Sequence, residues 1–287
     1  MAEAVGVVGA GIMGSGIAEV AARSGCDVVV REVDASTAAA GRDRITASLD
    51  RAVRSGKLAA GDREAALGRL RFTTADDDLA DRDVVIEAIV EDEAEKTAVF
   101  QAVSKVVRPD CLIASNTSSI PIMKLAAAAE RPERVNGMHF FNPVPVLPLV
   151  ELIPSLLTAP ETLERAQAFA TDRLGKKTVL SKDRAGFVVN SLLIPYLLAA
   201  IRMVESGFAS AHDVDTAMVA GCAHPMGPLA LADLIGLDTT AAVAASMYAE
   251  FKEPLYAPPP LLLRMVEAGL LGRKAGRGFH DYRRGAT

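Results

Sequence analysis

The glycine pattern near the start of the chain constrains its fold more than any other feature. Residues 4–8 are apolar, Gly9-Ala-Gly-Ile-Met-Gly14 follows, and a helical pattern then runs to about Ser24. A second apolar run, residues 27–30, ends in Arg31-Glu32. Because glycine tolerates tight turns and close backbone approach, this order predicts a strand, a turn, a helix and a second strand with a carboxylate at its tip.

The rest of the chain extends this pattern and then departs from it. Apolar runs at 83–88, 111–115 and 135–141 alternate with helical segments, which predicts a parallel sheet with helices on both faces. Residues 36–70 predict two helices broken near Ser55-Gly56 and Gly61, and only helical segments follow residue 181. We therefore expect an α/β fold. A Rossmann-type, mostly parallel sheet domain with a helical-hairpin insertion covers residues 1–183, and an all-α C-terminal domain covers residues 184–287.

Composition excludes several classes of protein. The 287 residues suggest two domains, and the net charge of −5 argues against general nucleic-acid binding. The most apolar run, residues 186–204, contains Asn190, Pro195 and Arg202, which favours a buried helix over a membrane span. Three cysteines without a CxxC pair give no metal site or disulfide framework. With a first strand starting by residue 4, no signal peptide is expected, and we predict a cytoplasmic protein.

In its strand–turn–helix context the glycine pattern indicates a dinucleotide site. Gly9 would allow the turn, Gly11 the approach of the pyrophosphate and Gly14 close helix–strand packing, while the helix N-terminus favours phosphate. Glu32, eighteen positions after Gly14, would bind the adenosine ribose, which favours NAD, although the adjacent Arg31 could accommodate NADP. The predicted cofactor contacts here are Gly9, Ala10, Gly11, Ile12, Met13, Gly14 and Glu32.

The segment from His139 to Glu151 carries the candidate chemistry. Its three prolines, Pro143, Pro145 and Pro148, exclude a helix, so we predict that a loop returns Glu151 to His139. A histidine beside a carboxylate is a tunable proton carrier near neutral pH, and this one follows a strand on the side of the sheet where ligands bind. Together with the cofactor, the pair suggests hydride chemistry, although a lone histidine in a strand could also be structural.

Several motifs occur in an order that resembles one enzyme family. They are Ile86-Glu-Ala-Ile-Val-Glu91, Ser115-Asn-Thr-Ser-Ser119, His139-Phe-Phe-Asn-Pro-Val-Pro145, Leu149-Val-Glu151, Gly186-Phe-Val-Val-Asn190, Pro225-Met-Gly-Pro228, Gly236-Leu-Asp-Thr239 and Gly278-Phe279. Over nearly the whole chain, this set resembles the 3-hydroxyacyl-CoA dehydrogenase family, especially the stand-alone bacterial 3-hydroxybutyryl-CoA dehydrogenases. The resemblance implies reversible NAD-dependent oxidation of a short 3-hydroxyacyl-CoA in fatty-acid or butanoate metabolism. It also implies a homodimer formed through the C-terminal domain.

The resemblance assigns roles residue by residue. His139 matches the catalytic histidine and Glu151 its partner, while Ser118 and Asn190 match residues that hold the reacting end of the substrate. The matching cofactor contacts are Asn116, Ser118, Glu91, Lys96 and Lys274. Plainer interpretations remain open: a turn at residues 116–119, a solvated helix face for Glu91 and Lys96, a surface basic pair of Arg273 and Lys274, and a structural hydrogen bond for Asn190.

The predicted helical insertion is basic, with eight basic against four acidic residues between Arg42 and Arg71. The same resemblance assigns it a function. If residues 41–55 are helical, Arg44, Ser48, Arg51 and Ser55 share one face. Ser48 matches a coenzyme-A contact, and Arg44 and Arg51 suit its phosphates, although a charged surface is the alternative. Ser55 replaces a basic contact of the family, for which Arg54 or Lys57 could substitute. Two further departures, Ala185 and Ser191, flank Asn190.

Two other functions stay open at this point. One is a nicotinamide-dependent dehydrogenase of a small free hydroxy acid, which would not need the basic helical insertion. The other is a non-catalytic NAD-binding relative that keeps the fold. The joint presence of His139, Glu151, Ser118 and Asn190 argues against the second.

Overall fold

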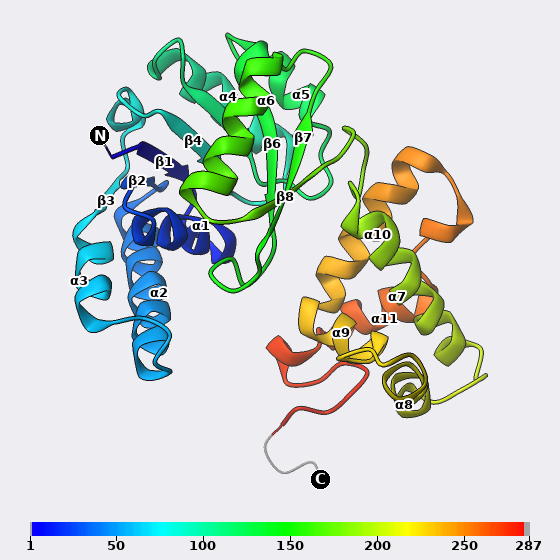
Figure 1. Cartoon of the computed structure of the whole chain (residues 1–287). Helices are drawn as coiled ribbons and strands as arrows, with labels where there is room; N and C mark the ends of the chain where they lie inside the picture. Colours follow the sequence, from blue (N-terminus) through cyan, green and yellow to red (C-terminus); the bar gives the residue numbers. More distant parts are fainter. Residues whose placement is uncertain (1, 284–287) are drawn as a thin grey trace. The chain divides into compact units, whose positions relative to one another are not determined.

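The computed structural model describes residues 2–283, and the chain divides into two compact units, residues 1–184 and 185–287 (Figure 1). The first unit is built around an eight-stranded sheet in the order β3-β2-β1-β4-β5-β6-β7-β8. All neighbouring strands are parallel except β6 and β7, which are antiparallel. The strands are β1 (Ala4–Val8), β2 (Asp27–Arg31), β3 (Leu70–Thr73), β4 (Val84–Glu87), β5 (Leu112–Ser115), β6 (Val135–Phe140), β7 (Leu149–Pro154) and β8 (Lys177–Leu180).

Helices cover both faces of this sheet, as expected. On one face, α1 and α6 pack with alternate strand residues such as Val7, Ile86 and Met138 in a single apolar core. The other face meets α5, since a side chain added at Gly137 would strike Ile122. The helical segments are α1 (Ile12–Arg23), α2 (Ala35–Arg54), α3 (Ala60–Gly68), η1 (Asp76–Leu79), α4 (Glu93–Val106), α5 (Ile122–Ala128), η2 (Pro132–Arg134), α6 (Pro160–Ala168) and the π-helical η3 (Phe169–Arg173).

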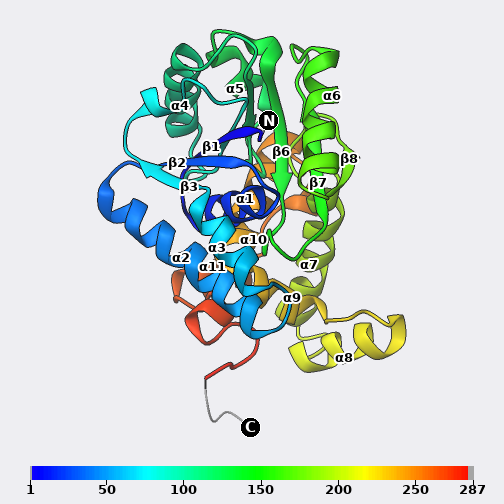
Figure 2. The ribbon, with the colours of Figure 1, turned by 60° about the vertical axis from the view of Figure 1, so that its left-hand side comes forward.

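The predicted helical insertion is present. Figure 2 shows α2 and α3 side by side, and both pack against α1. Asp34 caps α2 by accepting a 2.8 Å hydrogen bond from the Thr37 amide, and Ser55 ends the helix. Gly61, however, lies inside α3 and not at a break, because an exposed glycine in the first helical turn is tolerated there.

The second unit is helical. Its segments are α7 (Val189–Glu205), α8 (Ala211–Cys222), α9 (Pro228–Ile235), α10 (Leu237–Phe251), η4 (Pro254–Tyr256), α11 (Pro260–Glu267) and η5 (Arg273–Ala275). Asp215 caps α9 through the amides of Leu229 and Ala230, at 2.8 and 2.9 Å. It also contacts His280 Nε2 at 2.7 Å, which ties the chain beyond α11 to α8.

Among the described residues, no single helix is long and apolar enough to cross a membrane. Helices α9 and α10 pass such a test only as a pair, and they are bent by 95° at the break between them. The expected fold class, a mostly parallel sheet with helices followed by a helical C-terminal part, is confirmed.

Candidate active site

The glycine loop between β1 and α1 needs its glycines for two different reasons. Gly9 has φ +96°, and a side chain there would also lie 2.7 Å from the Ala88 carbonyl oxygen. A side chain on Gly14 would lie 1.9 Å from the Gly9 carbonyl oxygen, so the helix could not pack so closely on the turn. Both predicted roles are confirmed. A side chain on Gly11 would meet no protein atom within 4 Å, as expected where a cofactor's phosphates approach.

Glu32 follows the carboxyl end of β2 and faces this loop. Its Oε1 accepts a hydrogen bond from the Ala10 amide, and Oε2 accepts one from Val33 at 3.1 Å. The α1 N-terminus has no acidic residue in its first turn to compete for an anion. An open loop, a helix N-terminus and a carboxylate at the next strand end fit a bound dinucleotide.

Two arginines near the loop have partners within the fold. Arg31 Nε lies 2.7 Å from Asp76 Oδ1, so its charge is countered within the fold. Arg44, predicted to contact coenzyme A, donates from Nη1 to the Ala10 carbonyl and, at 3.3 Å, to Ser15 Oγ. Further along α2, Ser48 is half-buried and Arg51 is exposed.

His139 and Glu151 meet because β6 and β7 are antiparallel and in register. The two residues are directly opposite each other, and His139 Nδ1 lies 2.8 Å from Glu151 Oε2. Residues opposed across antiparallel strands project to the same face. Glu151 is fully buried and His139 is 6% exposed. The prediction that the proline-rich segment returns Glu151 to hydrogen-bond distance of His139 is confirmed.

The connecting loop is held in place by two contacts. The buried Lys176 donates to the carbonyls of Val144 and Leu147, at 2.6 and 2.7 Å. Val144 also covers α1, since a side chain on Gly16 would come within 2.8 Å of it. The loop between the two strands is thereby fastened to the cofactor-binding half of the sheet.

Asn116 links the histidine strand to the neighbouring loop. Its Oδ1 accepts a 2.9 Å hydrogen bond from the amide of Phe140, the residue after His139. The backbone N–H of Asn116 donates to the Glu87 carbonyl at 2.9 Å. The loop that carries Ser118 therefore starts from a point fixed to both β4 and β6.

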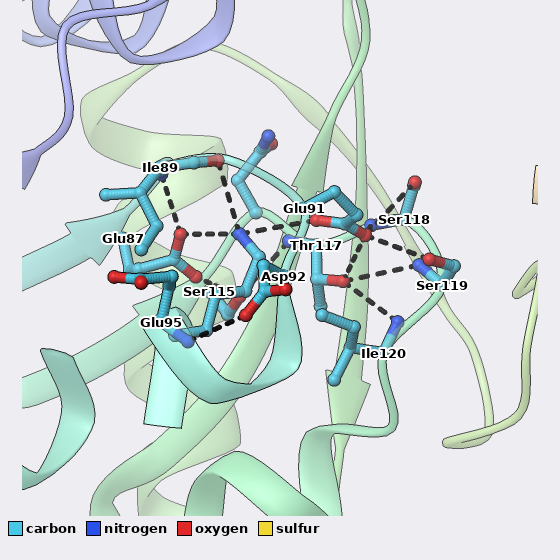
Figure 3. A network of polar contacts seen from close by, with 12 residues as sticks. Glu87, Ile89, Glu91, Asp92, Glu95, Ser115, Thr117, Ser118, Ser119 and Ile120 are labelled. Atoms are coloured by element: carbon cyan, nitrogen blue, oxygen red, sulfur yellow. Dashed lines mark hydrogen bonds and ion pairs between the residues drawn. The ribbon is translucent and has the colours of Figure 1, made fainter. Parts of the chain in front are cut away.

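A buried charge network supports this loop (Figure 3). Lys96 Nζ lies 2.5 Å from Glu87 Oε1 and 3.3 Å from Glu91 Oε2, and the side chains of Lys96 and Glu87 are both only 1% exposed. The interpretation of Lys96 as part of a solvated helix face is therefore wrong. Glu87, to which the sequence assigned no role, also accepts from Ser115 Oγ at 2.6 Å and from the Ile89 amide at 2.7 Å.

Glu91 connects the charge network to Ser118 and its neighbours through hydrogen bonds. Its Oε1 accepts from Thr117 Oγ1 at 2.6 Å, from the Ser118 amide at 2.9 Å and from Ser119 Oγ at 3.0 Å. Burial raises the pKa of Glu91, but the charge of Lys96 and these hydrogen bonds outweigh burial and lower the pKa below its usual value. An ionised Glu91 thus holds residues 117–119 in place.

The second unit contains the remaining predicted residues. Asn190 is half-buried at the second position of α7. Lys274 Nζ lies 2.6 Å from Asp238 Oδ2, with half of its side chain exposed. Of the two departures from the family pattern, Ala185 donates from its amide to Glu250 at 3.1 Å, and Ser191 Oγ donates to the Phe187 carbonyl at 2.5 Å. Both fit local helix packing. No group of residues 2–283 has the arrangement of a metal site.

Comparison with known proteins agrees with this geometry. Residues 4–184 match the NAD-binding domain of 3-hydroxyacyl-CoA dehydrogenase, and residues 186–282 match its C-terminal domain. A 3-hydroxybutyryl-CoA dehydrogenase of Mycobacterium tuberculosis is 61% identical over 279 residues, 97% of this chain and 98% of the relative. The human mitochondrial hydroxyacyl-coenzyme A dehydrogenase is 41% identical, over 97% of this chain and 91% of its own.

Solved structures agree as well. The crystal structure of FadB2 from M. tuberculosis superimposes with a TM-score of 0.96 at 61% identity, over 97% of this chain and 98% of that chain. That of (S)-3-hydroxybutyryl-CoA dehydrogenase PaaH1 from Ralstonia eutropha has a TM-score of 0.93 at 44% identity, over 99% and 100%. The chain therefore belongs to the 3-hydroxyacyl-CoA dehydrogenase family, an NAD-dependent oxidoreductase family.

Proposed function

We propose that the protein catalyses the reversible, NAD-dependent oxidation of short (S)-3-hydroxyacyl-CoA thioesters, such as 3-hydroxybutyryl-CoA, to 3-oxoacyl-CoA. One observation carries this proposal: a buried carboxylate lies 2.8 Å from a histidine at the ligand-binding edge of a dinucleotide-binding sheet. Oxidation of a hydroxyl needs a base and a hydride acceptor together. The histidine can act as the base, and the dinucleotide-binding loop can hold the hydride acceptor. The names of the relatives support the thioester and its short chain.

His139 is the proposed general base. Glu151 accepts a hydrogen bond from the Nδ1–H group, and Nε2 is the proposed acceptor of the proton of the substrate 3-hydroxyl. The adjacent carboxylate stabilises the imidazolium that forms during the reaction. A bound NAD, held at the glycine loop and Glu32, would supply the acceptor for the hydride from substrate C3. In the reverse direction, the protonated His139 donates its proton to the 3-oxo group.

Ser118 and Asn190 are the proposed positioning groups for the substrate oxygen. Ser118 presents its hydroxyl from a loop fixed by Glu91, so little freedom is lost when substrate binds. Asn116 and Lys274 are proposed contacts of the cofactor, with the buried Lys96 acting on it through Glu91.

The exposed face of α2 is the proposed support for coenzyme A. Ser48 and Arg51 are the candidates there, since the Arg44 guanidinium lies against the glycine loop. Arg54 and Lys57, both exposed, are the cations available near Ser55 for a second phosphate contact. We also propose that the protein forms a homodimer through the helical unit and is located in the cytoplasm. Light scattering and cell fractionation test them.

A single substrate comparison tests the function. The purified protein is given NADH with acetoacetyl-CoA or with free acetoacetate, and the loss of absorbance at 340 nm is followed. We expect rapid oxidation of NADH with the thioester and a catalytic efficiency lower by orders of magnitude with the free acid. Faster reaction of the free acid would indicate a hydroxy-acid dehydrogenase. NADH binding without turnover of either compound would indicate a non-catalytic relative.

A further inference from the structure

Two opposite charges flank the same residue of the glycine loop. The Glu32 carboxylate accepts the hydrogen bond of the Ala10 amide, and the Arg44 guanidinium donates to the Ala10 carbonyl. Arg44 comes from α2 and not from the strand end that carries Glu32. Because the amide and carbonyl belong to one residue, both side chains lie at the same end of the predicted cofactor site.

The position of Glu32 says what that end of the site binds. A carboxylate after the second strand of such a sheet binds the ribose 2′-hydroxyl of NAD, and a nearby arginine accommodates the 2′-phosphate of NADP. Arg31 is adjacent in sequence but is paired with Asp76 at 2.7 Å. Arg42 is directed to Phe72, with its guanidinium carbon 4.7 Å from the ring centre. Of these three arginines, Arg44 is the one in contact with the glycine loop.

Arg44 can turn to a ligand at small cost. Ser15 Oγ donates to the Ala10 carbonyl at 2.7 Å, so the carbonyl keeps a partner when the guanidinium moves. Arg44 is exposed overall and its contact with Ser15 is long, at 3.3 Å. A guanidinium on a mobile side chain binds phosphate through paired, charge-assisted hydrogen bonds.

We propose that Arg44 is a specificity-determining residue of the cofactor site, which offsets the charge of Glu32 and gives the protein affinity for the 2′-phosphate of NADP. NAD remains the preferred cofactor, because Glu32 repels that phosphate. The proposal rests on dinucleotide binding by the first unit and not on the acyl-CoA reaction.

Binding measurements without substrate test this role. The dissociation constants of NADH and NADPH are measured by the fluorescence of the reduced nicotinamide at low salt. We expect Arg44→Met to raise the dissociation constant of NADPH about tenfold and that of NADH less than about threefold. One charge-assisted hydrogen bond is worth about a factor of ten in affinity. The matched controls Arg31→Met and Arg42→Met should leave the ratio of the two constants unchanged.

The Glu32→Gln variant separates a direct effect of Arg44 on the 2′-phosphate from damage to the glycine loop. Glu32→Gln should strengthen NADPH binding, and adding Arg44→Met to it should remove that gain. Equal weakening of both cofactors by Arg44→Met would overturn the proposal, because Arg44 would then only support the loop. An unchanged ratio, or a shift caused by Arg31→Met instead, would overturn it too. Absence of acyl-CoA turnover would leave these constants measurable, so the two proposals fail separately.

Discussion

Replacing Lys96 by methionine should destabilise the first unit strongly. The Lys96 and Glu87 side chains are each 1% exposed and lie 2.5 Å apart, so the change leaves a carboxylate buried without its cation. Such a loss costs about 3–5 kcal/mol. Glu87 keeps its hydrogen bonds from Ser115 Oγ and the Ile89 amide, and these partly stabilise the remaining charge. We therefore expect the free energy of unfolding to fall by about 3 kcal/mol. This is a large share of the 5–15 kcal/mol that is usual for the free energy of unfolding of a folded domain.

Urea unfolding followed by circular dichroism measures this cost, since the chain has no tryptophan for fluorescence. Lys105→Met is the matched control, because Lys105 is exposed on the same helix and its loss should change the free energy of unfolding by less than about 0.5 kcal/mol. The double variant Glu87→Gln/Lys96→Met should be more stable than Lys96→Met alone, because no uncompensated Glu87 charge remains. A cost below about 1 kcal/mol for Lys96→Met, or no recovery in the double variant, would refute the reasoning.

Other outcomes follow from the same contacts. The pKa of Glu91 is lowered in the fold, so its contribution to stability is complete above about pH 4.3 and is lost as the pH falls through the lowered value. The difference in unfolding free energy between the wild type and Glu91→Gln should therefore be constant from pH 6 to 8 and shrink in acid; a constant difference down to pH 3 would contradict this. Burial raises the pKa of Cys26 to about 11 and that of Cys111 to about 12, whereas Cys222 is exposed. A thiol reagent at pH 8 should modify one cysteine rapidly in the folded protein and three after denaturation, and rapid modification of all three in the folded protein would contradict the buried placement.

The sequence predicted the elements whose signals are local. Runs of buried apolar residues gave β1, β2, β4, β5 and β6, and the prolines gave the return of Glu151 to His139, because both depend on neighbouring residues alone. It did not predict β3 or β8, which are short strands of only partly buried or exposed residues. Such strands are defined by pairing with a neighbour and not by an apolar run.

The sequence was less informative about charged side chains. Glu91 and Lys96 were identified as a pair, but Glu87, the main partner of Lys96, was missed. A carboxylate at the end of a wholly buried strand was the available signal, because a charge there needs a partner. The contact between Arg44 and the glycine loop was not predicted, because a helical pattern gives the direction of a side chain around the axis and not its reach to a distant loop.

The turnover of His139→Gln tests the central claim most directly. General-base catalysis contributes about 10²–10⁴-fold, so NADH oxidation at saturating acetoacetyl-CoA should fall by at least a hundredfold. NADH affinity and the circular dichroism spectrum should stay unchanged, because the cofactor loop and the core do not depend on the imidazole. A turnover within a few fold of the wild type would contradict the assignment of His139 as the proton carrier.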